Sequence, residues 1–472
     1  MGDNQAAPFN RTVIVGVLLS AAFLTILNQT LLLTAVPPIM SELHIDANQA
    51  QWLTTAFLLT NGVLIPVTAF LIERFSSRSL LIAALLIFAA GTLLGALAPS
   101  FSFLLAARVI QAGGAGIMMP LMQTVMLTIY PPERRGAAMG MTGLVIAFAP
   151  AIGPSLSGWI IDHFSWRHLF YLVFPLAVAV LIAAVFLMKN VTAQQEAKVH
   201  VPSIILSTLG WGGLLYGFSM VGRDGWSDPA VIGSLLAGSI SLALFIRLQL
   251  RMDRPLLEFR VFCFRIFTLT TLLSVVGFAL MIGAETLMPL YAQHVRGFTA
   301  LESGALMLPG AILNGIMSPI SGRIFDRVGG RGLTIGGFAL IVLSMVLFLN
   351  IGMSTSLLYI AGAFALMMTG ISMSMMPLMT AGMNALPPHL IPHGTAMGNT
   401  IRMVGGSIGT ALLVSVMSSV AERHGATGPS FALLDGILAG FAVSGALAAI
   451  GLLLTFAMGK EKKEKRQAAA GR

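Results

Sequence analysis

Residues 117–140 read IMMPLMQTVMLTIYPPERRGAAMG, and residues 374–398 read SMMPLMTAGMNALPPHLIPHGTAMG. The two stretches share one pattern of prolines, glycines and apolar residues. Pro120 pairs with Pro377 at a shift of 257, and the prolines and glycines that follow keep this register to within one residue. Chance would not hold the register over so many positions, so the sequence predicts a duplicated structural unit.

Two shorter stretches support the duplication from another part of the unit. IERFSSR around Glu73 is repeated as IFDRVGGR around Asp326, at a shift of 253. If the duplicated unit is a bundle of six membrane-spanning helices, the duplication places a pseudo-two-fold axis along the membrane normal, with a cavity between halves that can rock about a central site. This geometry favours transport by alternating access over a purely structural scaffold.

The composition excludes a water-soluble fold. The 472 residues are 56% hydrophobic and only 10% charged, with a mean hydropathy of +0.89, whereas soluble domains carry about 25% charged residues. The single cysteine, Cys263, excludes a disulfide within the chain. The net charge of +9 forms no aromatic-interleaved patch, so we expect no nucleic acid partner.

Uncharged runs of membrane-spanning length predict an all-α polytopic membrane protein with fourteen transmembrane helices. Two six-helix groups flank a pair of helices that has no counterpart in the repeat. The expected spans are 13–35, 52–71, 79–98, 101–122, 136–158, 169–188, 203–221, 230–250, 266–290, 303–321, 332–350, 355–378, 395–420 and 433–458. The expected domains are an N-terminal bundle at 1–190, the inserted pair with its linker at 191–265, a C-terminal bundle at 266–458 and a basic tail at 459–472.

Basic residues predict the orientation, because positive charge in short loops resists translocation. Of the 27 Lys and Arg residues, 21 fall in alternate segments beginning with the N-terminal tail and four in the intervening loops. The remaining two, Arg108 and Arg402, lie inside expected spans. We therefore expect both ends of the chain in the cytoplasm.

Several stretches carry a family resemblance, among them QWLTTAFLL, APSFSFLLAARVIQA, RGAAMGMTGLVIAFAPAIGPSLSG and LPGAILNGIMSPISGRIFDRVG. Over nearly its full length the chain resembles the major facilitator superfamily, specifically the fourteen-helix drug/proton antiporters of the EmrB/QacA type. Within that family it is most similar to the lincomycin-efflux type. The resemblance implies proton-coupled efflux of amphipathic antibiotics, lincosamide-like compounds among them.

Arg108 stands in RVIQAGGAG in the fourth expected span, where a permanent charge is costly unless it has a partner. Gln111, one turn further along, shares its helical face. The resemblance implicates this Arg in proton coupling; the alternative is an Arg that binds backbone carbonyls and serves packing.

AFAPAIGPSLSG in the fifth span resembles the antiporter motif of exporters, with Ser157 departing from its usual Gly. Pro150 and Pro154 lie on one face, and each lacks an N–H, so the helix can bend. We interpret the motif as part of a gate, and the alternative is a simple proline kink. The expected gate residues are Pro150, Gly153, Pro154 and Gly158.

The loops after the second span of each half place an acid and bases at predicted cytoplasmic helix ends, where ion pairs can open and close. The alternative is that these are simple topology charges. The first copy departs from the family pattern at Glu73 and Ser76, and the second copy is intact. The expected gating residues are Glu73, Arg74, Arg78, Gly322, Asp326, Arg327 and Arg331.

In the first span, Asn28 stands where the family usually has Asp, so this position cannot titrate. Glu285 in the ninth span is then the best proton-carrier candidate, and an interfacial carboxylate is the alternative. Arg402 either faces the cavity or extends to the interface. The expected cavity or substrate residues are Asn28, Gln29, Gln111, Asn314 and Arg402.

The sequence contains no P-loop and no segment long enough for a nucleotide-binding domain, so we expect no ATP use and no cofactor. The histidines from His294 to His424 are expected in loops, without metal-ligand spacing. The expected partners are small drug-like molecules, protons and the lipid bilayer, with the protein acting as a monomer. The alternative function within transport is a dedicated exporter of an endogenous metabolite. An intramembrane enzyme or receptor would need a catalytic cluster in the spans or a large soluble segment, and the sequence contains neither, so we expect no enzyme.

Overall fold

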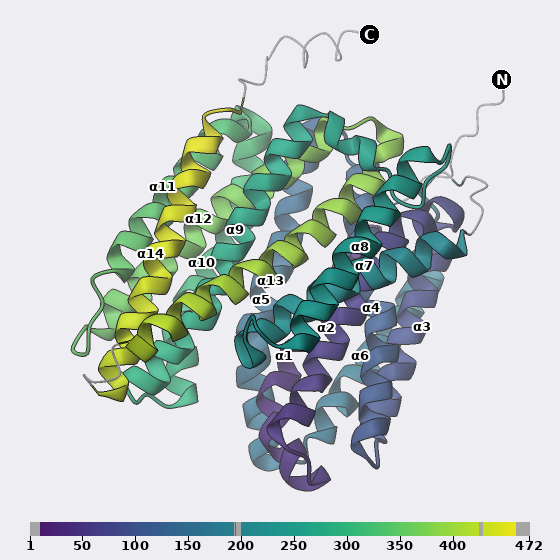
Figure 1. The fold of residues 1–472 in the computed structure, drawn as a ribbon. Helices are drawn as coiled ribbons and strands as arrows, with labels where there is room; N and C mark the ends of the chain where they lie inside the picture. The colour runs from purple at the N-terminus through teal and green to yellow at the C-terminus, as the bar shows by residue number, and fades with distance from the viewer. Residues whose placement is uncertain (1–9, 193, 195–199, 424–427, 459–472) are drawn as a thin grey trace, which may run out of the picture. The chain divides into compact units, whose positions relative to one another are not determined.

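The computed structural model describes residues 10–192, 194, 200–423 and 428–458, and Figure 1 shows their helices. Within these described residues, fourteen helices are long and apolar enough to cross a bilayer, which confirms the predicted all-α, fourteen-span fold. The helices are α1 (Arg11–Leu43), α2 (Ala47–Arg74), α3 (Ser77–Ala96), α4 (Phe101–Ile129), α5 (Arg135–His163), α6 (Arg167–Leu187), α7 (Val201–Asp224), α8 (Pro229–Arg251), α9 (Arg265–Leu290), α10 (Ala300–Val328), α11 (Gly330–Phe348), α12 (Leu357–Asn384), α13 (Ile391–Arg423) and α14 (Pro429–Thr455).

Several helices extend well beyond the predicted spans. Helix α1 continues through Pro37 and Pro38 to Leu43, and α4 continues through Pro120 to Ile129. Proline is tolerated within such helices because neighbouring helices and polar side chains satisfy the carbonyls that it leaves free. Proline therefore does not end either helix, whereas the predicted first span ended before Pro37.

Polar side chains fix where the helices begin. Asp46 accepts a hydrogen bond from the backbone N–H of Gln49, whose side chain binds back to Asp46. Thr299 and Glu302 form the same reciprocal box at the start of α10. These caps satisfy backbone N–H groups that have no partner within a first helical turn.

The duplication is visible in the packing of the helices. Within the first six helices, the packed pairs are α3 with α4 and α6, α2 with α4, and α1 with α4 and α6. Adding eight to each number gives α11 with α12 and α14, α10 with α12, and α9 with α12 and α14, all of which are packed pairs. Short 3₁₀ turns, η1 (Pro132–Arg134) and η4 (Pro388–Leu390), also precede α5 and α13 alike. The predicted pair of related six-helix bundles is thus confirmed.

Helices α7 and α8 are the inserted pair, and they lie side by side (Figure 1). A Cβ added at Gly213 would lie 2.9 Å from the Gly238 backbone, so glycine lets the two helices approach closely. Helix α7 also packs against α2. Trp211 and Leu215 of α7 form an apolar cluster with Val404 of α13.

The chain forms two compact units. The first contains Met1–Pro131, Leu144–Val261 and Leu386–Ser407, and the second contains Pro132–Gly143, Phe262–Ala385 and Ile408–Arg472. Each unit therefore includes the first turns of one helix whose remainder belongs to the other unit. The domain boundaries expected from the sequence stay a prediction, and the basic tail at 459–472 lies outside the described residues.

Candidate functional site

Arg108 lies buried in the middle of the N-terminal bundle, with 1% of its surface exposed. Its Nε donates to the backbone oxygen of Leu53 at 3.3 Å, and its Nη1 donates to Oε1 of Gln111 at 2.6 Å. The ring centre of Phe57 lies 4.2 Å from the guanidinium carbon, within cation–π distance. Neutral groups of α2 and α4 thus hold this charge in place.

Gln111 extends this network to two further helices. Its Oε1 faces Arg108, so its Nε2 donates to both Oδ1 of Asn28, at 3.0 Å, and Oγ1 of Thr92, at 2.8 Å. The direction of donation fixes the Asn28 amide, whose oxygen must accept. Asn28 Nδ2 and Arg108 Nη2 are then buried without a hydrogen-bond partner among the described residues.

The network brings together three of the predicted residues, Arg108, Gln111 and Asn28, from α4 and α1. In the part of the chain that the structure describes, no carboxylate forms an ion pair with Arg108. With an amide at position 28, the network holds a charge but offers no group that exchanges a proton near neutral pH. Gln29, the next residue on α1, is half-buried and takes no part in the network.

The antiporter-like motif of α5 packs against α1. Gly153 is buried, and a Cβ there would overlap the Thr30 hydroxyl. Ser157 donates to the backbone oxygen of Leu31 at 2.6 Å and is also hydrogen-bonded to the hydroxyl of Thr34. The unexpected Ser157 thus forms two of the hydrogen bonds that join α5 to α1.

The other three motif residues, Pro150, Pro154 and Gly158, are less closely packed than Gly153. Pro150 is half-buried and Pro154 is exposed. A Cβ added at Gly158 would meet no atom within 4 Å. Close approach of α1 therefore depends on Gly153 rather than Gly158, and the gate role of the motif remains a prediction.

Glu73, at the end of α2, binds the start of α13 in the first compact unit. Its Oε1 lies 2.9 Å from Nε2 of His393. Arg74 is exposed against the rings of Phe70 and Phe75. Arg78 donates to the backbone oxygen of Val185 at 2.6 Å and so fastens α3 to α6.

Asp326, near the end of α10, makes the corresponding contact in the second unit. Its two carboxylate oxygens accept the backbone N–H groups of Gly136 and Ala137, each at 2.8 Å, at the start of α5. A Cβ on Gly136 would overlap the backbone oxygen of Gly322, so both glycines are needed for this approach. Of the two bases that follow, Arg327 is exposed and Arg331 donates to the backbone oxygen of Phe456 at 3.4 Å.

Arg402 belongs to a second polar cluster, between α13 and α4. The guanidinium donates to Oδ1 of Asn399, and Nδ2 of Asn399 donates to Oε1 of Gln123 at 2.7 Å. Gln123 is buried, whereas Arg402 and Asn399 are half-buried. The cluster therefore brings one cation and two amides together where α13 meets α4.

The remaining candidates, Glu285 and Asn314, belong to the second compact unit. Glu285 is exposed on α9, and it forms no hydrogen bond or ion pair with another residue of the described ranges. Asn314 is half-buried on α10, and its backbone oxygen accepts from Ser318 at 2.8 Å.

The sequence did not single out His393, Gln123 or Asn399. His393 was expected in a loop, but it is the third residue of α13 and is 5% exposed. One signal was available for His393. In the register of the repeat it corresponds to Arg135, and both residues directly precede the paired glycines.

Comparisons with known proteins agree with this architecture. The family model of the Major Facilitator Superfamily matches residues 18–410. The human organic anion transporter MFSD10 has a similar fold, with a TM-score of 0.67 and 15% identity over 94% of this chain and 99% of that chain.

Bacterial relatives are similar at the level of sequence. The uncharacterized MFS-type transporter YcnB of Bacillus subtilis is 60% identical over 98% of both chains. The lincomycin resistance protein LmrB of Bacillus subtilis is 41% identical over 94% of this chain and 95% of its own length. The multidrug export protein EmrB of Escherichia coli is 28% identical over 87% of this chain and 81% of its own length. The chain therefore belongs to the Major Facilitator Superfamily, as a fourteen-helix transporter of the EmrB/QacA type.

Proposed function

We propose that this transporter exports small amphipathic drug-like molecules, lincosamide-like antibiotics among them, in exchange for protons. The observation that carries the proposal is the identity of 40–41% with proteins named for lincomycin resistance, over 94% or more of this chain. Similarity over nearly the full length includes both bundles and the inserted helices, so it is not confined to one motif.

Alternating access gives the polar contacts at the helix ends a mechanical role. Glu73 binds the start of α13, and Asp326 binds the start of α5, so each acid joins one half of the repeat to a helix of the other half. Such contacts have to form and break as the halves rock about a central site. In this proposal they hold one end of the transporter closed, and the end that they close is the cytoplasmic one.

Proton exchange is assigned to Arg108 and Glu285. The Arg108 network contains an amide at position 28, where the family usually has an acid, so the proton has to bind elsewhere. Glu285 is a carboxyl group within a membrane-spanning helix, and such groups mark ion or proton pathways. Arg108 then acts by holding its polar network in position, without binding the proton itself.

The substrate cavity is proposed to include the amide and basic groups identified above, with Asn28, Gln29, Gln111, Asn314 and Arg402 among them. These groups hydrogen-bond to neutral and singly charged molecules, while flexible Met side chains adapt to apolar surfaces of different shape. The protein is proposed to act as a monomer in the bacterial inner membrane, with both chain ends in the cytoplasm and without ATP.

Expression in an efflux-deleted bacterium tests drug export. We expect wild type to raise the minimal inhibitory concentration of lincomycin at least several-fold, and Arg108→Ala, at equal abundance in the membrane, to lose this effect. Unchanged sensitivity to a broad antibiotic panel would contradict drug export and favour a dedicated exporter of an endogenous metabolite.

Transport in proteoliposomes tests whether export is coupled to proton movement. With a pH-sensitive dye inside, adding substrate to wild type should move protons, whereas Glu285→Gln should move substrate without protons or stop both. Glu302→Gln is the matched control, because Glu302 only caps the start of α10. Full coupling in Glu285→Gln would exclude Glu285 as the proton carrier.

A further inference from the structure

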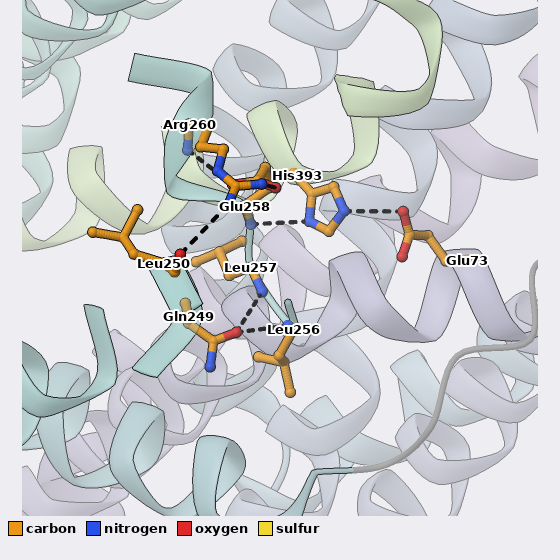
Figure 2. Close-up of polar contacts among 8 residues, drawn as sticks. All are labelled: Glu73, Gln249, Leu250, Leu256, Leu257, Glu258, Arg260 and His393. Atoms are coloured by element: carbon orange, nitrogen blue, oxygen red, sulfur yellow. Dashed lines mark hydrogen bonds and ion pairs between the residues drawn. The ribbon is translucent and has the colours of Figure 1, made fainter. Parts of the chain in front are cut away.

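His393 connects three segments that are far apart in the sequence, as Figure 2 shows. Its Nε2 lies 2.9 Å from Oε1 of Glu73 at the end of α2, and its Nδ1 lies 3.3 Å from the backbone nitrogen of Glu258. Glu258 belongs to the linker between α8 and α9. Both ring nitrogens are thus in use, and His393 is 5% exposed.

The partners of the ring fix its protonation state. A backbone N–H can only donate, so Nδ1 must accept and carries no proton. The proton of the neutral ring is then on Nε2, which donates to the carboxylate of Glu73. The hydrogen bond that Nδ1 accepts therefore requires a neutral His393 ring.

The linker is held firmly up to Glu258. The side-chain oxygen of Gln249, on α8, accepts the backbone N–H of Leu256 at 2.6 Å and that of Leu257 at 3.4 Å. The Gln249 amide nitrogen donates to the Ser203 hydroxyl of α7 at 2.6 Å. These bonds connect the inserted helix pair to the linker, and the linker is in turn bound to His393. Figure 2 shows the hydrogen bonds from Gln249 to the linker and from the linker to His393.

Each surrounding element contributes charged groups. Helix α2 contributes Glu73 and Arg74, and the linker contributes Glu258 and Arg260, whose side chains pair at 3.7 Å. The turn before α13 contributes the exposed His389. Glu73 places a carboxylate oxygen 2.9 Å from Nε2 of the His393 ring.

We propose that His393 is a proton-operated clasp. The neutral ring holds the α8–α9 linker against the start of α13, and a proton on Nδ1 releases the linker. The reason is geometric: a protonated Nδ1 would point its hydrogen at the N–H of Glu258, so two donors would face each other. The same proton strengthens the ion pair with Glu73. Protonation therefore exchanges one contact for another: α13 stays bound to α2, while the α8–α9 linker is freed from α13.

Two substitutions separate the contact of His393 with Glu73 from its contact with Glu258. The oxygen of Asn stands in the position of Nδ1, so His393→Asn keeps an acceptor for Glu258 and loses the contact with Glu73. The amide nitrogen of Gln stands in the position of Nε2, so His393→Gln keeps a donor to Glu73 and loses the acceptor for the linker. His389→Gln is the matched control, since it removes an exposed histidine one turn before α13.

Hydrogen exchange of the full-length protein, measured by mass spectrometry on peptides covering Leu256–Glu258, reads the clasp directly. After correction for intrinsic rates, wild type and His389→Gln should exchange about fivefold faster at about pH 6 than at about pH 8, as expected for loss of one hydrogen bond when the ring binds a second proton. His393→Gln should be fast at both pH values, and His393→Asn slow at both. Exchange in wild type that does not depend on pH would overturn the proposal, as would protection in His393→Gln equal to that of wild type at pH 8. Neither outcome depends on the transported substrate.

Discussion

The carboxylate of Asp326 accepts the backbone N–H of Gly136 through one oxygen and that of Ala137 through the other, each at 2.8 Å. A helix begins with N–H groups that have no partner within the helix, and it carries a partial positive charge there. Asp326 therefore does for α5 what a capping side chain does, although it lies 190 residues away in the sequence.

Asp326→Asn is expected to destabilise the second compact unit. One amide oxygen still accepts, but the NH₂ group then faces a backbone N–H, which costs about 1–3 kcal/mol for the unsatisfied donor. Thermal unfolding in detergent, followed by the circular dichroism of the helices, should show a lower midpoint. Asp162→Asn on the exposed side of α5 is the control and should match wild type. Equal midpoints for all three proteins would show that the contact adds nothing to stability.

The glycines of the α5 motif should differ in their sensitivity to a methyl group. In Gly153→Ala the new Cβ overlaps Thr30, so α1 and α5 have to separate, and we expect transport to fall about tenfold or more, as overpacking of about 1–3 kcal/mol implies. In Gly158→Ala the Cβ meets no atom within 4 Å, so transport should stay near wild type. Drug efflux from intact cells at matched abundance measures both variants. Equal loss in the two would mean that the motif does not act through this helix contact.

The fold was predictable because a bilayer restricts which backbone conformations a spanning segment can adopt. Each span needs about 20 apolar residues in a helix that satisfies its own backbone. The repeat around Pro120 and Pro377 then divides the fourteen spans into two groups of six helices and one inserted pair. Helix ends were harder to predict. Proline was taken as a boundary at Pro37, whereas α1 continues to Leu43 because its surroundings satisfy the backbone.

The site was predictable only where neighbours on one helix define it. Arg108 and Gln111 are three residues apart, so their contact follows from helix geometry. The bond between Glu73 and His393 joins residues 320 apart, and no local pattern predicts which histidine arrives there. The same applies to the pairing of Gln123 with Asn399, 276 residues apart.

The Arg108 network predicts strong coupling between two substitutions. Gln111→Leu removes the acceptor of a buried guanidinium and is expected to cost about 3 kcal/mol or more, because the charge is left without that partner. Arg108→Met with Gln111→Leu removes both groups and should be more stable than Gln111→Leu alone. Thermal unfolding of the two single variants and the double variant gives the coupling energy. If the losses of unfolding free energy in the two single variants add up to the loss in the double variant, the two side chains do not depend on each other.

The ion pair between Glu42 and Arg167 predicts a stability that depends on pH. The Arg167 guanidinium, hydrogen-bonded to Glu42, and the indole N–H of Trp166, at 2.7 Å, hold the pKa of the Glu42 carboxyl below its ordinary value of 4.5. A carboxyl whose pKa is lowered by folding stabilises the fold above its unfolded-state pKa, and this contribution is lost as the pH falls through the folded-state pKa. Glu42→Gln should therefore lower the thermal midpoint at pH 7, by a small amount because the carboxylate is 46% exposed, and the difference from wild type should shrink below pH 4.5. Unfolding scans of both proteins from pH 7 to pH 4 measure this, and a difference that stays constant across the range would assign the loss to packing against Trp166 rather than to charge.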